Sequence, residues 1–153
     1  MLISALVAFA HHLAAFAIAA ALVVELITLR GELTVERARR LVNMDAVYGV
    51  AAMAIIVIGI ARVVWLEKSA GYYLHSAPFI AKMILFAAIG LISIRPTVTF
   101  LSWRDALAQN RVPVLAADVQ RRLRAIVHLE LALLALVILC AALMAKGVGF
   151  FGG

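Results

Sequence analysis

Histidine, lysine and carboxylate side chains stand inside long apolar stretches of this chain. The first stretch, Leu2–Arg30, contains His11, His12 and Glu25. Ionisable groups buried in an apolar medium are costly, and they normally face a protein interior or a water-filled path. Neutral imidazole is a common ligand of metals and of haem iron, whereas carboxylates and imidazoles both bind and release protons. These residue types therefore indicate two chemistries, which are cofactor ligation and proton transfer.

The two neighbouring histidines point in different directions if the stretch is helical, because successive residues lie about 100° apart. His11 shares a face with Ile18 and Glu25, and His12 shares a face with small residues (Ala5, Ala8, Ala15 and Ala19). Small residues on one face mark the close approach of another helix or of a flat ligand. We predict His12 as an axial ligand of b-type haem, with His11 as its alternative and as the other candidate metal ligand. The competing interpretation makes each a packing histidine that is hydrogen-bonded to a neighbouring helix.

Three further basic residues are predicted in the same half of the membrane as His11 and His12. Lys82 stands one turn into the third segment, where it could extend to the surface, pair with a haem propionate or act as a second ligand. His75 is another candidate second ligand. Arg62 is first interpreted as part of an interfacial charge network with Glu67 and Lys68, and as an alternative its guanidinium has the shape to bind a propionate.

A second polar group opens the last apolar segment, in the sequence VHLEL. His128 and Glu130 are two residues apart and so do not face one another on a helix. Either could meet Glu25, which is predicted at the same level. Such an arrangement would suit proton movement or fix a histidine tautomer, and a buried ion pair that orients two helices is the alternative. The chain contains no CxxC, HExxH or P-loop motif.

The elements that must position these residues are membrane spans. Of the 153 residues 67% are hydrophobic, and the mean hydropathy is +1.11, far above that of a soluble domain. Four segments are long enough to cross a bilayer, at about 2–29, 46–66, 78–101 and 125–145. None shows the alternation of a barrel strand, so all four are predicted as helices. We predict an all-α, single-domain, four-helix integral membrane bundle.

The distribution of arginine and lysine predicts the orientation of the bundle in the membrane. Most of the arginines lie in the connections at residues 30–45 and 102–124, whereas the second connection has only Lys68. The positive-inside rule places the two arginine-rich connections in the cytoplasm and both termini outside. The expected location is the bacterial inner membrane, as a multi-pass protein, with the lipid bilayer as the first partner. The net charge of +6 is read as this loop asymmetry and not as a sign of nucleic-acid binding.

Local signals predict the ends of the spans. Thr34 and the following arginines predict a short amphipathic helix at the membrane surface, after which Asp45 would cap the second span. Pro78 is predicted in the first turn of the third helix, where its missing N–H costs nothing. Pro96 predicts that this helix kinks or ends, unless residues 97–103 prolong it.

The whole chain resembles a family of small bacterial inner-membrane proteins of unknown function. The similarity lies in HHLAAF near the start, DAVYG in the second segment, YYLHSAPFIAK before the third and VHLEL in the fourth. More distantly, the chain looks like the HemJ-type protoporphyrinogen oxidases and the CopD-type membrane domains. The HemJ resemblance implies b-type haem, a first-helix histidine at His12 or His11, and a lysine at Lys82. The tryptophan and proline after that histidine are absent here, and Ser93–Pro96 replaces later histidines, so haem binding is implied more strongly than porphyrinogen oxidation.

Three functions follow as hypotheses. The leading one is a haem b protein that transfers electrons or oxidises a membrane-soluble quinol or porphyrinogen, which would make it an oxidoreductase. The second is a small proton-coupled transporter that uses Glu25, His128 and Glu130. Such a short chain would have to form a homo-oligomer to enclose a path, and its small-residue faces would permit this. The third is a non-catalytic assembly subunit.

Overall fold

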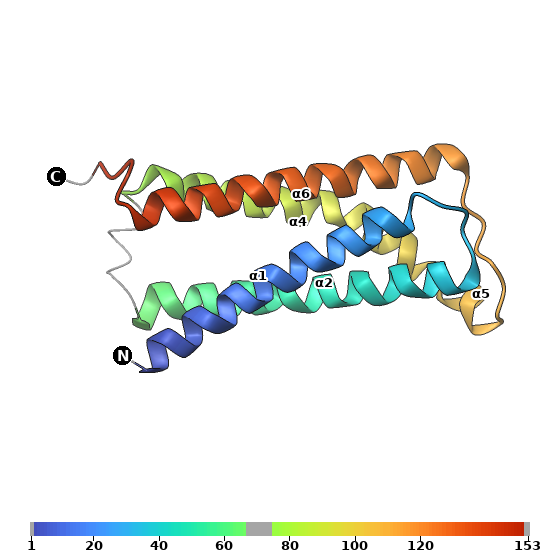
Figure 1. Ribbon diagram of the computed structural model, residues 1–153, viewed down its shortest axis with the longest axis horizontal. Helices are drawn as coiled ribbons and strands as arrows, with labels where there is room; N and C mark the ends of the chain where they lie inside the picture. Colours follow the sequence, from blue (N-terminus) through green and yellow to red (C-terminus); the bar gives the residue numbers. More distant parts are fainter. Residues whose placement is uncertain (1, 67–74, 152–153) are drawn as a thin grey trace.

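The computed structural model describes residues 2–66 and 75–151, and it is a bundle of long helices (Figure 1). The helices are α1 (Leu2–Thr28), α2 (Val35–Ala61), the π-helical η1 (Arg62–Leu66), α4 (Ala77–Leu101), the short α5 (Arg104–Ala108) and α6 (Ala117–Ala145). Four helical segments among the described residues are long and apolar enough to cross a membrane. Large apolar side chains face outward along all four, where they contact the lipid bilayer. The predicted all-α membrane bundle is confirmed.

The bundle is built from two helix pairs. Helix α1 packs along α2, and α4 packs along α6; the pairs meet through smaller contacts of α1 with α6 and of α2 with α4. The connections 29–34 and 102–116 and the arginine-containing first turns of α2 and α6 lie at one end of the molecule, called here the arginine end (Figure 1). Both chain termini lie at the other end, the terminal end. This is the grouping that the positive-inside rule requires. Lys68, which also entered that prediction, lies outside the described residues.

The prediction of a separate surface helix before the second span is wrong. Helix α2 runs without a break from Val35 to Ala61, so the helix begins eleven residues before position 46. Thr34 caps it, because its side chain accepts a hydrogen bond from the backbone N–H of Arg37 at 3.2 Å. Residues 35–45 contain good helix formers and no proline, so nothing stops the helix in this stretch. Asp45 is consequently buried inside a continuous helix and caps nothing.

Two other predicted boundaries shift for similar reasons. Helix α6 begins at Ala117 instead of 125, because the residues that follow Pro113, including the basic cluster near position 122, favour a helix. Helix α4 continues through Pro96 to Leu101, so the residues after this proline prolong the helix. Pro78 lies in the first turn of α4, as predicted.

The buried core lies toward the arginine end. Its most deeply buried members include Leu29, Leu41, Phe100, Leu123 and Val127, each at most 2% exposed. Within the described helices, no residue of α1 before Ile18, of α2 after Ala51 or of α6 after Leu134 is buried. In α4 the stretch between Pro78 and Ile89 contains none either. The two helix pairs are therefore held together in one half of the molecule, and they diverge toward the terminal end (Figure 1).

Removing the cap of α2 is expected to have a modest effect on stability. The Thr34→Ala variant loses the hydrogen bond to the Arg37 N–H, which costs about 1 kcal/mol. Thermal unfolding in detergent, followed by circular dichroism, measures this. Thr99→Ala is the matched control, since the Thr99 hydroxyl bonds only to the Arg95 carbonyl of its own helix. Equal midpoints for the two variants would show that Thr34 does not cap the helix.

Candidate functional site

Three carboxyl groups from three helices lie together inside the bundle. They are Glu25 of α1, Asp45 of α2 and Glu130 of α6, and we call them the carboxyl cluster. They are 2%, 7% and 1% exposed, respectively. Their charges are close enough to interact. The charge of Glu25 is repelled by those of Asp45 and Glu130, and the charge of Glu130 is repelled by that of Asp45.

Each member occupies a place on its helix that would otherwise belong to the core. Glu25 follows buried Ile18 and Leu22 at seven- and three-residue steps and precedes buried Leu29 by four. Glu130 stands between Val127 and Leu134 in the same way. Because residues three and four apart share one face of a helix, packing of the apolar neighbours forces the carboxyl groups inward. The positions of Glu25 and Glu130 on the apolar faces of their helices thus bury carboxyl groups that would be more stable in water.

Helix α4 contributes polar neighbours but no charge. The Thr97 hydroxyl donates a hydrogen bond of 2.7 Å to Oδ1 of Asp45. Ser93 lies beside the hydroxyl of Tyr48, a buried residue of α2 that also senses the charges of the carboxyl cluster. All four long helices therefore line the same polar region.

Glu25 and Glu130 are less well satisfied than Asp45. The Oε1 atom of each is buried and has no hydrogen-bond partner. The ion pairs described in the structure, Arg40–Glu36 and Arg122–Asp118, lie on exposed surface and do not reach the cluster. An ionised carboxylate in such a place costs several kcal/mol, roughly, unless a positive charge or a proton neutralises it. This arrangement favours a group that binds a proton.

The same region does not have the geometry of a metal site. Among the described residues, no three His, Cys, Asp or Glu side chains are placed to hold one metal ion. A proton needs a single oxygen and no coordination shell.

The structure separates the histidines from the carboxyl cluster. His12 is exposed, and its Nδ1 lies 2.6 Å from the carbonyl oxygen of Ala8 in its own helix. His11 is half-buried and faces α2, where its Cε1 would lie 4.0 Å from a Cβ placed on Gly59. The rings of His11 and His12 are perpendicular, with centroids 6.3 Å apart. His128 is exposed and lies 2.9 Å, at Nδ1, from the Arg124 carbonyl, so it does not join Glu25 and Glu130.

The other candidate haem partners belong to different parts of the bundle. Lys82 of α4 places its Nζ 5.0 Å from the ring centroid of Phe79. The ring of His75, just before α4, lies edge-on to Phe151 at 5.8 Å. Arg62 is on η1, which contacts α1 and α2, and its predicted network partners, Glu67 and Lys68, lie outside the described residues. The α1 histidines and the α4 group lie on different helix pairs, and haem binding stays a prediction.

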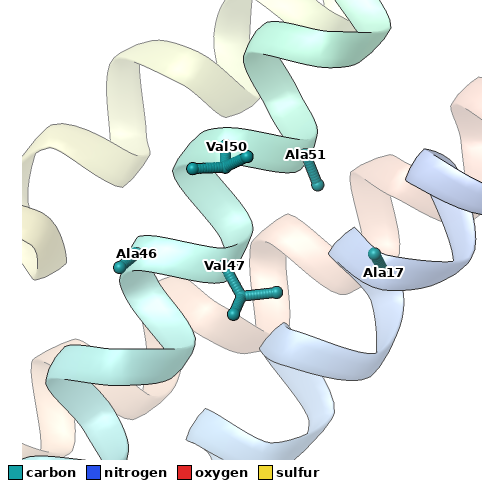
Figure 2. Close-up of a pocket in the computed structure, with 5 residues that line it drawn as sticks. All are labelled: Ala17, Ala46, Val47, Val50 and Ala51. Carbon is teal, nitrogen blue, oxygen red and sulfur yellow. The ribbon is translucent and has the colours of Figure 1, made fainter.

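A shallow apolar groove of about 370 Å³ lies between α1 and α2 (Figure 2). It is lined by Ala17, Ala46, Val47, Val50 and Ala51. Val50 is 72% exposed, so the groove faces outward toward lipid. None of the predicted haem ligands and no member of the carboxyl cluster lines it.

Sequence reasoning missed Asp45, Tyr48 and Thr97 as site residues. The sequence predicts Asp45 as a helix cap because the apolar part of α2 starts after it, whereas the helix itself starts at Val35. A usable signal was present, since Leu41, Asp45 and Tyr48 follow one helical face once the helix begins at Val35. Thr97 gave no signal of its own, because threonine is common in membrane helices and only the neighbouring helix reveals its partner.

The fold and the buried polar site define a four-span α-helical membrane protein. Residues 3–149 match the family described as "Predicted membrane protein (DUF2214)", and the chain belongs to that family. No curated protein and no solved structure matches the chain. The resemblance to HemJ-type oxidases and CopD-type domains therefore stays a prediction from the sequence.

Proposed function

We propose that this protein translocates protons across the membrane, with Glu25 and Glu130 as the groups that bind and release them. The observation that carries the proposal is the pair of buried Oε1 atoms without hydrogen-bond partners. A carboxyl group kept only to orient helices would be expected to have found a partner. An intramembrane ionisable residue with none is a candidate member of an ion or proton path.

The chemistry requires no cofactor and no electron transfer. A hydronium ion gives its proton to one carboxylate of the carboxyl cluster and leaves as water. The proton passes between Glu25 and Glu130, whose charges interact with each other and with that of Asp45, and leaves to water on the opposite side. Repulsion between neighbouring carboxylates favours binding of one proton and release of the next.

The Asp45 carboxyl is assigned a positioning role. Its Oδ1 already accepts the hydrogen bond from Thr97, so it is held in place against α4. Its charge acts on both glutamates, and it can thereby set how readily they take up a proton. We place the activity in the bacterial inner membrane, where the arginine end would face the cytoplasm.

The test is proton flux into liposomes that contain the purified protein and a trapped pH-sensitive dye. After an acid jump with potassium and valinomycin to balance charge, the lumen should acidify faster than in protein-free liposomes. Glu25→Gln keeps the size of the side chain but cannot carry a proton, so it should lower the flux about ten-fold or more. Glu36→Gln is the control, because Glu36 is 85% exposed on the surface of α2 and should leave the flux unchanged.

A wild-type rate equal to that of protein-free liposomes would overturn the proposal. So would equal rates for wild type and Glu25→Gln. An absorbance spectrum of the same preparation from haem-replete cells tests the haem hypothesis in parallel: that hypothesis requires a Soret band that His12→Ala abolishes.

A further inference from the structure

Among the described residues, the carboxyl cluster has fewer buried side chains on its terminal side than on its arginine side. Toward the terminal end, each long helix contributes one last buried residue to a layer that we call the thin layer: Ile18, Ala51, Ile89 and Leu134. Beyond it, the described parts of the four helices contain no buried side chain except Pro78, at the start of α4. Between the thin layer and the cluster lie the buried side chains of Ala21, Leu22 and Tyr48. Among the described residues, the cluster is therefore covered on this side by these three side chains and the thin layer.

Toward the arginine end the packing is several layers deep. We call this region the plug; it contains Leu29, Ala38, Leu41, Phe100, Trp103, Leu107, Leu123 and Val127. Phe100 and Trp103 also pack against each other, with ring centroids 5.1 Å apart. A proton or water molecule would have to displace several fully buried side chains to pass.

Hydrogen bonds reinforce the plug across the two helix pairs. Gln120 of α6 donates through Nε2 to the carbonyls of Leu29 and Gly31, each at 2.9 Å, just after α1. Arg39 of α2 donates to the Leu107 carbonyl and to Asn110, each at 3.2 Å. At the terminal end, the described backbone bonds outside the helices join only the two ends of the α4–α6 pair, as from Ala77 to Gly149. The pairs are thus fastened together at the arginine end.

We propose that the structure is the state in which protons reach the carboxyl cluster from the terminal end, past the thin layer, while the plug is closed. The inference rests on the proposed function, and it assigns the side of access and the residues that control it. Ile18 is the key member of the thin layer, since it lies on the Glu25 face of α1, seven residues away. Widening the thin layer should speed access, and thinning the plug by a similar volume should not.

The experiment is one-sided chemical modification of Glu25. A membrane-impermeant carbodiimide with glycine ethyl ester converts an accessible carboxyl group to an amide, which mass spectrometry of the Glu25 peptide detects. Vesicles of both orientations are used on a Cys140→Ser background. Orientation is scored with an impermeant thiol reagent on Val114→Cys, a site 97% exposed at the arginine end. We expect labelling only when the carbodiimide is on the terminal-end side.

Two variants sharpen the result. Ile18→Ala should raise the labelling rate several-fold from the terminal end, whereas Val127→Ala in the plug should leave it unchanged. Size-exclusion profiles show whether each variant is folded, and the sidedness of the wild-type protein does not depend on either. Labelling from the arginine end, labelling from neither side, or a larger effect of Val127→Ala would overturn the inference. If flux still requires Glu25 in that case, the proposed function stands and only the side of access is wrong.

Discussion

Glu25→Leu is expected to give a protein that is more stable than the wild type and inactive. Leucine has nearly the volume of glutamate and fits the apolar neighbours Leu22 and Leu29, which are both 1% exposed. The substitution removes a buried carboxyl group that has an unpartnered Oε1, together with its repulsion from Asp45 and Glu130. Replacement of buried charges by well-packed apolar residues stabilises proteins by about 1–4 kcal/mol in favourable cases.

Thermal unfolding in detergent measures the gain, and the liposome assay measures the loss of proton flux. The control is Glu36→Leu, at an exposed position of α2, for which stability should change by no more than about 0.5 kcal/mol. A Glu25→Leu protein less stable than wild type would show that Glu25 makes a favourable contact in the folded state. That outcome would favour a purely structural role for the carboxyl group.

A buried residue that lowers the stability of the fold is a better candidate for a functional role than one that only packs. Glu25 and Glu130 occupy core positions at which an apolar side chain of similar volume would avoid the cost of burying a carboxyl group. The Asp45–Thr97 pair is different, because its hydrogen bond compensates part of the burial. The two glutamates are therefore better candidates for the proton-binding groups than Asp45.

The long-range features of this fold could be predicted from composition and charge. The number of spans, their helical nature and the common side of the arginine-rich connections follow from hydropathy and loop charge, which are properties of whole segments. Boundaries were less predictable, since the helix-forming residues before Asp45 and after Pro113 extend α2 and α6 beyond their apolar parts. Hydropathy measures the membrane-embedded part of a helix and not its ends.

Only part of the site could be predicted from the sequence, because the rotation of each helix about its axis could not. Glu25 and Glu130 were identified because carboxylates in apolar segments are conspicuous, and the structure brings them together. His128 was grouped with them by level along the bundle, but rotation about the helix axis turns it outward, two residues from Glu130. The same rotation separates His11, which faces α2, from exposed His12. Helix rotation depends on which neighbours pack together, and a single sequence does not contain that pairing.

Combining Glu25→Gln with Glu130→Gln should lower the proton flux hardly more than either substitution alone. If protons pass through both carboxyl groups in series, each single variant already interrupts the path, by about ten-fold or more. Groups that act as one unit show such strong non-additivity, whereas independent groups would multiply their losses. Two independent ten-fold losses would give about a hundred-fold loss, and a shared path gives only about ten-fold.

The measurement is the liposome flux of the wild type, both single variants and the double variant at equal protein content. Glu36→Gln combined with Glu25→Gln is the matched control, because the exposed Glu36 has no part in the path and should add no further loss. A double variant with a loss near the product of the single losses would show two separate proton routes. A Glu130→Gln variant with wild-type flux would remove Glu130 from the path and leave Glu25 with Asp45, the other carboxyl group whose charge it senses.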